Sequence, residues 1–378
     1  MLAETQTQTR EKYLAGLASE WPDSPARNRN EPKRLDAILD EVLDDIAARG
    51  ETPNPETESV LRGRMAASVV GFGVLQSYLD DPSVEEIWIN RPNEIRFARD
   101  GRSLVAEAAL PDTEITRLVD RMLRFSGRRI DRTQPFVDAE LPDGSRFHCV
   151  IPDITRSSYA VNIRKFLSTS RRLGQLVMLE VLTPAQADFL SQAIRSGKNI
   201  VVCGATQAGK TTMLAALLAE LDDSERVISI EETFELKLAN SDWVAMQTRP
   251  QAAEGLAEIT MRRLVKESLR MRPTRIVVGE VREAECLDLL IALNSGVPGA
   301  CTIHANSAWD AVEKLCSLPL LAGPNISADF IRQAVGSSID YVLFCRQVTG
   351  GRRRLETILQ LDWLGDSRTL DCRVVEVS

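Results

Sequence analysis

Two different patterns of apolar residues divide the chain. In the second half, short apolar runs predict buried strands at residues 200–202, 226–230, 275–278 and 301–304. Helix-forming stretches lie between or beside these runs, at residues 184–197, 210–217 and 287–294. Strands that alternate with helices predict an α/β domain over residues 186–378.

The first half of the chain mixes alternating and helical patterns. Strands are predicted at residues 84–89, 95–97, 145–151 and 159–166, with a helix at residues 113–126. These elements predict a smaller α+β domain over residues 56–166, followed by a connection over residues 167–185. Residues 1–55 are predicted to be a flexible and helical extension. Its apolar positions between residues 32 and 50 form one amphipathic helix, which either packs on its own domain or docks a partner.

The composition is that of a soluble globular protein. The hydrophobic fraction is 44%, and neither an apolar signal-peptide core nor a run of 18 apolar residues occurs. Seven scattered cysteines lack a Cys-x-x-Cys pair, which predicts buried thiols in a reducing cytoplasm. The net charge of -8 and pI of about 5.2 argue against wholesale nucleic-acid binding, because that partner needs a basic surface.

A phosphate-binding motif occupies the join between the run at 200–202 and the following helix. Gly204, Gly209, Lys210 and Thr211 satisfy G-x-x-x-x-G-K-[ST]. In such a loop the backbone N–H groups and the helix N-terminus face the phosphates, the lysine reaches the β- and γ-phosphates, and the threonine binds Mg²⁺. The predicted nucleotide contacts are Gly204, Ala205, Thr206, Gln207, Ala208, Gly209, Lys210, Thr211 and Thr212.

Carboxylates follow two later apolar runs. Glu231 and Glu232 follow the run at 226–230, and Glu280 follows the run at 275–278. We expect Glu280 to polarise the attacking water and to contact Mg²⁺ through water. Gly279 occupies the position where an aspartate is usual, so Thr211, the phosphates and water are expected to hold the metal. The alternative is that Glu280 is a surface residue at a strand end.

The chain has two histidines, and we expect different roles for them. His304 ends the run at 301–304, and in the extra-strand P-loop topology that strand lies beside the phosphate-loop strand. We therefore predict His304 as a sensor of the γ-phosphate, and a structural histidine is the alternative. His148 alternates with apolar residues on a strand that lacks catalytic neighbours, and we interpret it as structural.

Arginines concentrate in the smaller domain, and Arg146 and Arg164 are the candidates for phosphate contact from a neighbouring subunit. A solvated face is the alternative for each of them. Near the predicted Glu280 strand, Arg270, Arg272 and Arg282 either bind phosphate, pair with the acidic residues or face solvent.

Four motifs, in order, resemble those of the secretion superfamily ATPases, the hexameric motors of type II and type IV secretion, type IV pili and Flp (Tad) pili. They are GATQAGKTT (204–212), VISIEETFEL (227–236), LRMRPTRIVVGEVR (269–282) and TIHAN (302–306). Residues 80–90, 127–148 and 162–166 are similar to the CpaF/TadA-like branch, and residues 314–323 to its actinobacterial members. The resemblance begins near residue 60.

This resemblance implies a P-loop (RecA-like) C-terminal domain that binds ATP and Mg²⁺ and hydrolyses ATP. It further implies a homo-hexamer, peripheral at the cytoplasmic face of the membrane, that drives integral-membrane platform proteins in pilus assembly or secretion. The residues that match the family's catalytic motifs are Lys210, Glu231, Glu232, Glu280 and His304.

Some residues depart from the family pattern. Ala205, Gln207 and Ala208 stand where Gly, Gly and Ser are common, which removes backbone freedom from the loop. Glu232 replaces an aspartate, and Val297 stands where many members have His. A ring scaffold that binds nucleotide with little turnover is therefore one alternative function. A DNA-dependent P-loop translocase is another, which the acidic charge disfavours, and no N-K-x-D motif supports a GTPase.

Overall fold

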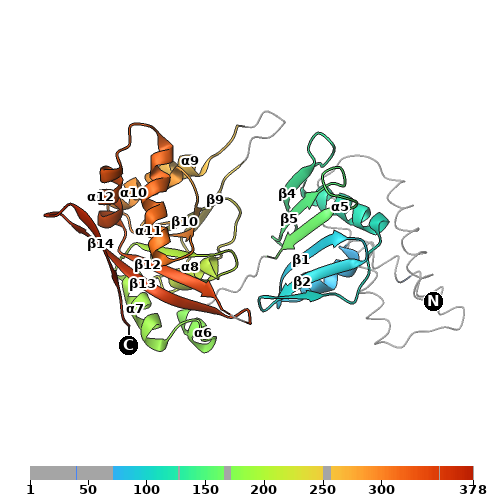
Figure 1. Cartoon of the computed structure of the whole chain (residues 1–378), viewed down its shortest axis with the longest axis horizontal. Coiled ribbons are helices and arrows are strands. Elements are labelled where there is room, and N and C mark those ends of the chain that lie inside the picture. Colours follow the sequence, from blue (N-terminus) through green and yellow to red (C-terminus); the bar gives the residue numbers. More distant parts are fainter. Residues whose placement is uncertain are drawn as a thin grey trace, which may run out of the picture. The chain divides into compact units, whose positions relative to one another are not determined.

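The computed structural model describes residue 40 and residues 71–126, 128–165, 172–249, 257–348 and 350–377 (Figure 1). The chain forms two compact units, Met1–Leu167 and Ser168–Ser378. Apart from Asp40, the predicted extension over residues 1–55 lies outside the described residues, and so do residues 56–70.

The first unit contains an antiparallel sheet of six strands in the order β3-β2-β1-β6-β5-β4. The strands are β1 (Val84–Arg91), β2 (Glu94–Arg99), β3 (Arg102–Val105), β4 (Phe136–Glu140), β5 (Arg146–Val150) and β6 (Ala160–Arg164). They are preceded by η2 (Gly73–Leu75) and α4 (Gln76–Asp80), and α5 (Asp112–Ser126) follows β3.

Alternation along the strands builds the core of this unit. Ile87 and Ile89 of β1 and Phe147 and Cys149 of β5 are buried, and they belong to one cluster with the apolar side of α5. The predicted strands and helix are found here. Strands β3 and β4 were not predicted, and β3 gives no signal because all four of its residues are exposed.

The second unit is an α/β structure with an eight-stranded sheet in the order β14-β13-β12-β7-β11-β10-β8-β9. Strands β12, β7, β11, β10, β8 and β9 are parallel to one another, whereas β13 pairs antiparallel with both β12 and β14. The bounds are β7 (Ile200–Gly204), β8 (Val227–Glu231), β9 (Trp243–Gln247), β10 (Arg275–Val281), β11 (Gly299–His304), β12 (Tyr341–Gln347), β13 (Arg353–Leu364) and β14 (Thr369–Val374).

Helices cover both faces of this sheet, which explains why its central strands are mostly apolar. Ile200 and Val202 of β7 pack with one set of helices, whereas Val201 and Cys203 pack with the other. The first set is α6 (Leu173–Met178), α7 (Pro184–Arg195) and α8 (Lys210–Leu218). The second set is α9 (Met261–Ser268), α10 (Glu285–Asn294), α11 (Ala308–Ser317) with η3 (Leu318–Ala322), and α12 (Ala328–Ser338).

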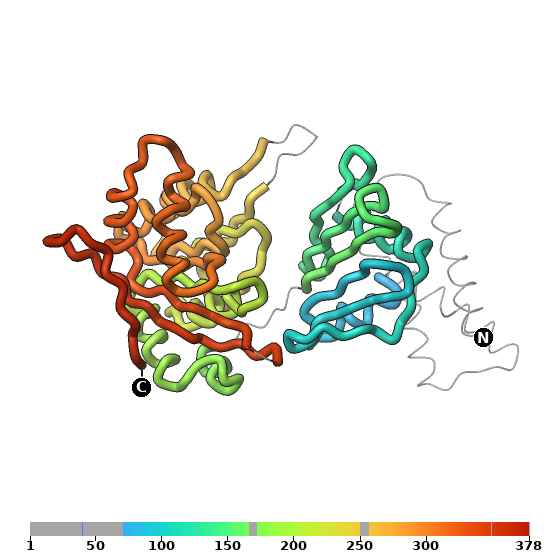
Figure 2. The backbone as a smooth tube through the Cα atoms, viewed as in Figure 1, coloured from blue at the N-terminus to red at the C-terminus, as the bar shows by residue number. Residues whose placement is uncertain are grey.

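The C-terminal segment returns to the sheet beside β7, and its last strand, β14, forms one edge. β12 pairs with β7 in parallel, so it lies on the opposite side of β7 from β11. Figure 2 shows this C-terminal segment in red. Strands β12, β13 and β14 were not predicted from the sequence, although β12 borders the strand that carries the phosphate-loop motif.

The predicted connection over residues 167–185 differs from the structure in part. Within it, α6 buries Leu173 and Leu176 in the core of the second unit, and the N–H of Leu355 on β13 donates to the carbonyl of Val181 at 2.9 Å. Thr183 then caps α7 by accepting a hydrogen bond from the N–H of Gln186. The apolar positions that appeared mixed in sequence therefore belong to a packed element.

All seven cysteines lie in described residues and are free thiols, five of them buried. Burial raises the pKa of Cys149 and of Cys301 to about 12, so both thiols stay protonated, as the prediction of buried hydrophobic cysteines requires. Among the described residues, no helix has the length and apolar character needed to span a bilayer.

Close packing at the start of β11 generates a stability prediction. A Cβ atom on Gly299 would lie 2.6 Å from the carbonyl oxygen of Ile276 and 2.6 Å from Leu293. We expect Gly299→Ala to lower the free energy of unfolding by about 1–3 kcal/mol, measured by urea denaturation. Gly174→Ala is the control, because a Cβ there meets no atom within 4 Å. Equal stability of the two variants would contradict the packing described.

Candidate active site

The loop between β7 and α8 has a backbone that requires both of its motif glycines. Gly204 has a φ of +155°, and a Cβ there would lie 2.3 Å from the carbonyl oxygen of Cys345 on β12. Gly209, the N-cap of α8, has a φ of +91°. Left-handed backbone is accessible to glycine at little energetic penalty, so these two residues allow the chain to turn from β7 directly into α8.

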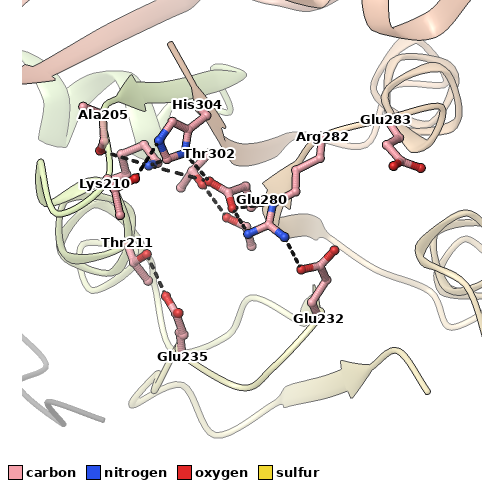
Figure 3. Close-up of polar contacts among 12 residues, drawn as sticks. Ala205, Lys210, Thr211, Glu232, Glu235, Glu280, Arg282, Glu283, Thr302 and His304 are labelled. Atoms are coloured by element: carbon pink, nitrogen blue, oxygen red, sulfur yellow. Dashed lines mark hydrogen bonds and ion pairs between the residues drawn. The ribbon is translucent and has the colours of Figure 1, made fainter. Parts of the chain in front are cut away.

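Lys210, the first residue of α8, points back over this loop (Figure 3). Its side chain is 9% exposed, and its Nζ donates to the carbonyl of Ala205 at 3.2 Å and lies 3.2 Å from Nδ1 of His304. Its Nζ also lies 3.6 Å from Oε1 of Glu280. A nearly buried ammonium is thus surrounded by polar groups of the loop, β10 and β11.

His304 lies directly beside the loop because β11 pairs with β7 in a register that sets it opposite Gly204. Its Nε2 is 3.0 Å from Oγ1 of Thr206, and its Nδ1 is 3.3 Å from Oε1 of Glu280 as well as near Lys210. Nδ1 therefore lies within hydrogen-bond distance of a donor, the ammonium of Lys210, and of an acceptor, the carboxylate of Glu280, and the tautomer of the ring decides which of the two it bonds.

Glu280 reaches this group of residues through a β-bulge. Between the Val278–Cys301 and Val281–Ile303 pairs, two residues of β10 face the single residue Thr302 of β11. The hydroxyl of Thr302 donates to the carbonyl of Gly279 at 2.6 Å, and this hydrogen bond stabilises the bulge. Bulges redirect side chains at strand ends, and this one accompanies a Glu280 side chain directed toward Lys210 and His304 (Figure 3).

The charge state of Glu280 is set by competing effects. Burial alone would raise the pKa of this carboxyl, but the charge and hydrogen bond of Arg282, the charge of Lys210 and the hydrogen bond of His304 outweigh burial. The pKa of Glu280 is therefore below the usual value for glutamate. The Nε of Arg282 donates to Oε2 of Glu280 at 2.7 Å, and its Nη1 donates to Oε2 of Glu232 at 2.6 Å. Arg282 thus pairs with acidic residues, one of the three uses that the sequence left open.

Glu231 and Glu232 occupy different environments, although they are adjacent. Glu231 is 2% exposed, and its Oε2 accepts from the N–H groups of Glu235 and Leu236 at 2.7 and 2.9 Å. Its Cγ leaves no room for a side chain on Gly279, because a Cβ there would lie 2.9 Å away. These contacts give Glu231 a role in shaping the turn after β8, while Glu232 neutralises Arg282.

Glu235 is a site residue that was not predicted from the sequence. Its Oε2 accepts from the hydroxyl of Thr211 at 3.0 Å. Thr211 is the predicted Mg²⁺ ligand, so Glu235 is a carboxylate in direct contact with that position. The described residues hold no group of three or more His, Cys, Asp or Glu suited to a metal. Thr211 and Glu235 both offer oxygen atoms, so this position fits Mg²⁺ that is otherwise held by phosphate oxygens and water, the usual arrangement for this ion.

The predicted residues of the first unit form a separate set. Arg146 and Arg164 are paired opposite each other on β5 and β6. His148 has Nδ1 2.7 Å from Oδ1 of Asp138 on β4, a partner that its interpretation as structural did not anticipate.

Besides Glu235, a second site residue that was not predicted from the sequence is Arg353 of β13. Its Nε donates to the carbonyl of Gln207 in the phosphate loop at 3.0 Å.

Comparison with known proteins identifies the family. Residues 69–349 match the family described as type II/IV secretion system protein, and the chain belongs to it. A putative conjugal transfer protein of Mycobacterium tuberculosis is 32% identical over 306 residues, 79% of this chain and 86% of that protein. The type IV secretion system protein VirB11 of Bartonella quintana is 30% identical over 314 residues, 73% of this chain and 88% of that protein.

Solved structures show the same fold. The pilus retraction motor PilT, solved with bound ADP, has a TM-score of 0.55 at 17% identity, covering 81% of this chain and 83% of that one. The Legionella pneumophila ATPase DotB has a TM-score of 0.52 at 20% identity, covering 78% of this chain and 81% of that one. The resemblance to secretion superfamily ATPases, predicted from four motifs, is thus confirmed.

The pairing of Arg282 with Glu280 predicts a pKa change. The charge and hydrogen bond of Arg282 are the largest causes that lower the pKa of Glu280. Arg282→Gln removes this charge while Glu280 stays buried, so we expect the pKa of Glu280 to rise. The lowered pKa of Glu280 contributes to the free energy of unfolding above the ordinary pKa of glutamate, and this contribution is lost as the pH falls through the lowered pKa of the folded protein. The contribution should be smaller in Arg282→Gln, because the pKa of Glu280 is then less depressed. NMR titration of labelled glutamates measures the shift. Arg263→Gln, which removes a partner of Glu267, should leave Glu280 unchanged. An unmoved Glu280 pKa in Arg282→Gln would contradict this electrostatic account.

Proposed function

We propose that this protein is an ATP-hydrolysing motor of a pilus-assembly or secretion machine. The observation that supports it most directly is the meeting of Lys210, Glu280 and His304 beside the loop that begins at Gly204. Three parallel strands end there, and in open α/β sheets ligands bind outside the carboxyl ends of strands.

The residues of the site supply the parts that phosphoryl transfer needs. The N-terminus of α8 and the loop N–H groups would bind the phosphates, with Lys210 exchanging the carbonyl of Ala205 for phosphate oxygens. Thr211 and Glu235 would hold Mg²⁺, directly or through water, and the ion neutralises charge on the phosphates when bound.

Glu280 would orient the attacking water. Its lowered pKa makes it an anionic acceptor that aligns and polarises water, and a weak base while Arg282 is paired with it. Arg282 is also paired with Glu232, so a shift of the guanidinium toward Glu232 would raise the basicity of Glu280. His304, between Lys210 and Thr206, would respond to the γ-phosphate because Lys210 is expected to bind that group and Thr206 is an expected nucleotide contact.

The assembly proposed is a homo-hexamer at the cytoplasmic face of the membrane that moves integral-membrane platform proteins. Membership in the family and the resemblance to the Flp (Tad), CpaF/TadA-like branch support this part of the proposal. Arg146 and Arg164 would meet the phosphates of a neighbouring subunit, since their adjacent positions on β5 and β6 concentrate positive charge.

A ring scaffold with little turnover is the second candidate, and Gln207 favours it. This residue has a φ of +63° at a position where the family commonly has glycine. Left-handed backbone is energetically unfavourable for a side-chain-bearing residue and would weaken the loop's hold on phosphates. The scaffold and motor proposals differ in whether ATP is turned over.

We expect Glu280→Gln to bind ATP with nearly unchanged affinity and to lose about 10²–10⁴-fold in kcat, because the amide lacks the charge that polarises water. Phosphate release and binding of a fluorescent ATP analogue measure the two effects. Glu283→Gln is the matched control, since Glu283 is exposed and its side chain points away from the site (Figure 3). Wild-type turnover in Glu280→Gln would contradict the catalytic assignment.

The role of Arg164 across subunits is tested by mixing. Arg164→Ala and Lys210→Ala should each be inactive alone, because one loses the arginine supplied to a neighbour and the other loses its own phosphate contact. Mixed hexamers contain some sites with both groups intact, so hydrolysis should recover in part. A mixture no more active than the separate variants would place the function of Arg164 elsewhere.

A further inference from the structure

The phosphate loop contains a backbone conformation that its sequence does not favour. Gln207 has a φ of +63°, in the left-handed region that residues with a Cβ atom rarely adopt. Such a residue persists only where its surroundings hold it. The contacts made to this peptide from outside the motif therefore bear on whether the loop keeps its shape.

Arg353, the first residue of β13, makes such a contact. Its Nε donates to the carbonyl oxygen of Gln207 at 3.0 Å across 146 positions of sequence. Its Cδ would lie 3.3 Å from a Cβ on Gly209, so the arginine stem packs against the end of the same loop. One side chain thus touches the loop at both Gln207 and Gly209.

The base of this arginine is fixed on both sides. Two residues along β13, the N–H of Leu355 donates to the carbonyl of Val181 at 2.9 Å. In the turn before β13, the N–H of Val348 donates to the carbonyl of Arg352 at 2.7 Å. The position of Arg353 is therefore set by backbone bonds to the segment before α7 and within the β12–β13 turn.

The bond to Gln207 fixes the orientation of a peptide group that phosphate would use. In a trans peptide, the N–H of Ala208 points away from the carbonyl of Gln207. That N–H donates to the carbonyl of Ala205 at 3.2 Å, the same oxygen that accepts from Nζ of Lys210. Two donors thus converge on one internal acceptor, and a phosphate oxygen at that place would accept from both.

We propose that Arg353 is a positioning residue for nucleotide binding. It holds Gln207 in the left-handed backbone conformation, which this residue would not keep without the hydrogen bond. This inference rests on the proposed function. It explains how the loop tolerates Gln207, because the hydrogen bond from the guanidinium offsets the free-energy cost of left-handed backbone, which a glycine would not have.

The test is a cycle of four full-length proteins: wild type, Arg353→Met, Gln207→Gly and the double variant. Methionine retains an apolar stem but cannot donate, so we expect about tenfold weaker binding of a fluorescent ATP analogue, a matching rise in KM and a smaller change in kcat. In the Gln207→Gly background the loop no longer needs the bond, so removing Arg353 should weaken binding less than about threefold. Arg354→Met, its exposed neighbour, is the control and should bind as wild type.

Unchanged binding by Arg353→Met would overturn the proposal, and so would an equal loss in the wild-type and Gln207→Gly backgrounds. Should Arg353→Met fail to fold, Arg353→Lys takes its place, with circular dichroism and the melting temperature as checks. Lysine lacks the fixed geometry of the guanidinium, so it should bind more weakly only when Gln207 is present. Failure of the wild type to bind ATP would overturn the proposed function instead, which separates the two conclusions.

Discussion

The parallel register of three strands is the constraint on which the site depends. β11 sets His304 opposite Gly204, and β12 brings the carbonyl of Cys345 so close to Gly204 that no side chain fits there. A slip of one residue would turn His304 to the other face of the sheet. A slip of β7 would also place a residue with a side chain against the carbonyl of Cys345, where only Gly204 fits.

Charges at this edge are arranged in an alternating chain. Lys210 lies between His304 and Glu280, Glu280 pairs with Arg282, and Arg282 pairs with Glu232. Each charge therefore has an opposite neighbour before any phosphate is present. A polyanion that binds Lys210 must compete with these pairs, and the change propagates to Glu280 because its charge state depends on both cations.

The sequence predicts much of this fold because the central strands are buried on both sides. An uninterrupted apolar run such as residues 276–278 is typical of a strand buried on both faces, and the glycine-bounded loop after β7 has a fixed motif. Strand β3 is exposed throughout and leaves no such pattern. The β12 strand is apolar, but nothing local shows that it joins the sheet beside β7.

Contacts distant in sequence account for what was missed in the candidate site. Thr302 and Gly279 form the bulge beside Glu280, yet a bulge depends on the register of two strands and not on either one. Arg353 follows a glycine turn and resembles the arginines around it. Its bond to Gln207 becomes visible only once β13 is placed. Glu235, by contrast, lies four positions after Glu231, and its spacing was the available signal.

The most direct test of the central claim is single-turnover hydrolysis of ATP by the full-length wild-type protein in the presence and absence of Mg²⁺. We expect bound ATP to be converted to ADP and phosphate only when Mg²⁺ is present, and Lys210→Ala to abolish binding. Mg²⁺-ATP that binds tightly and stays intact, both alone and with membrane partners, would contradict the claim and favour a nucleotide-binding scaffold.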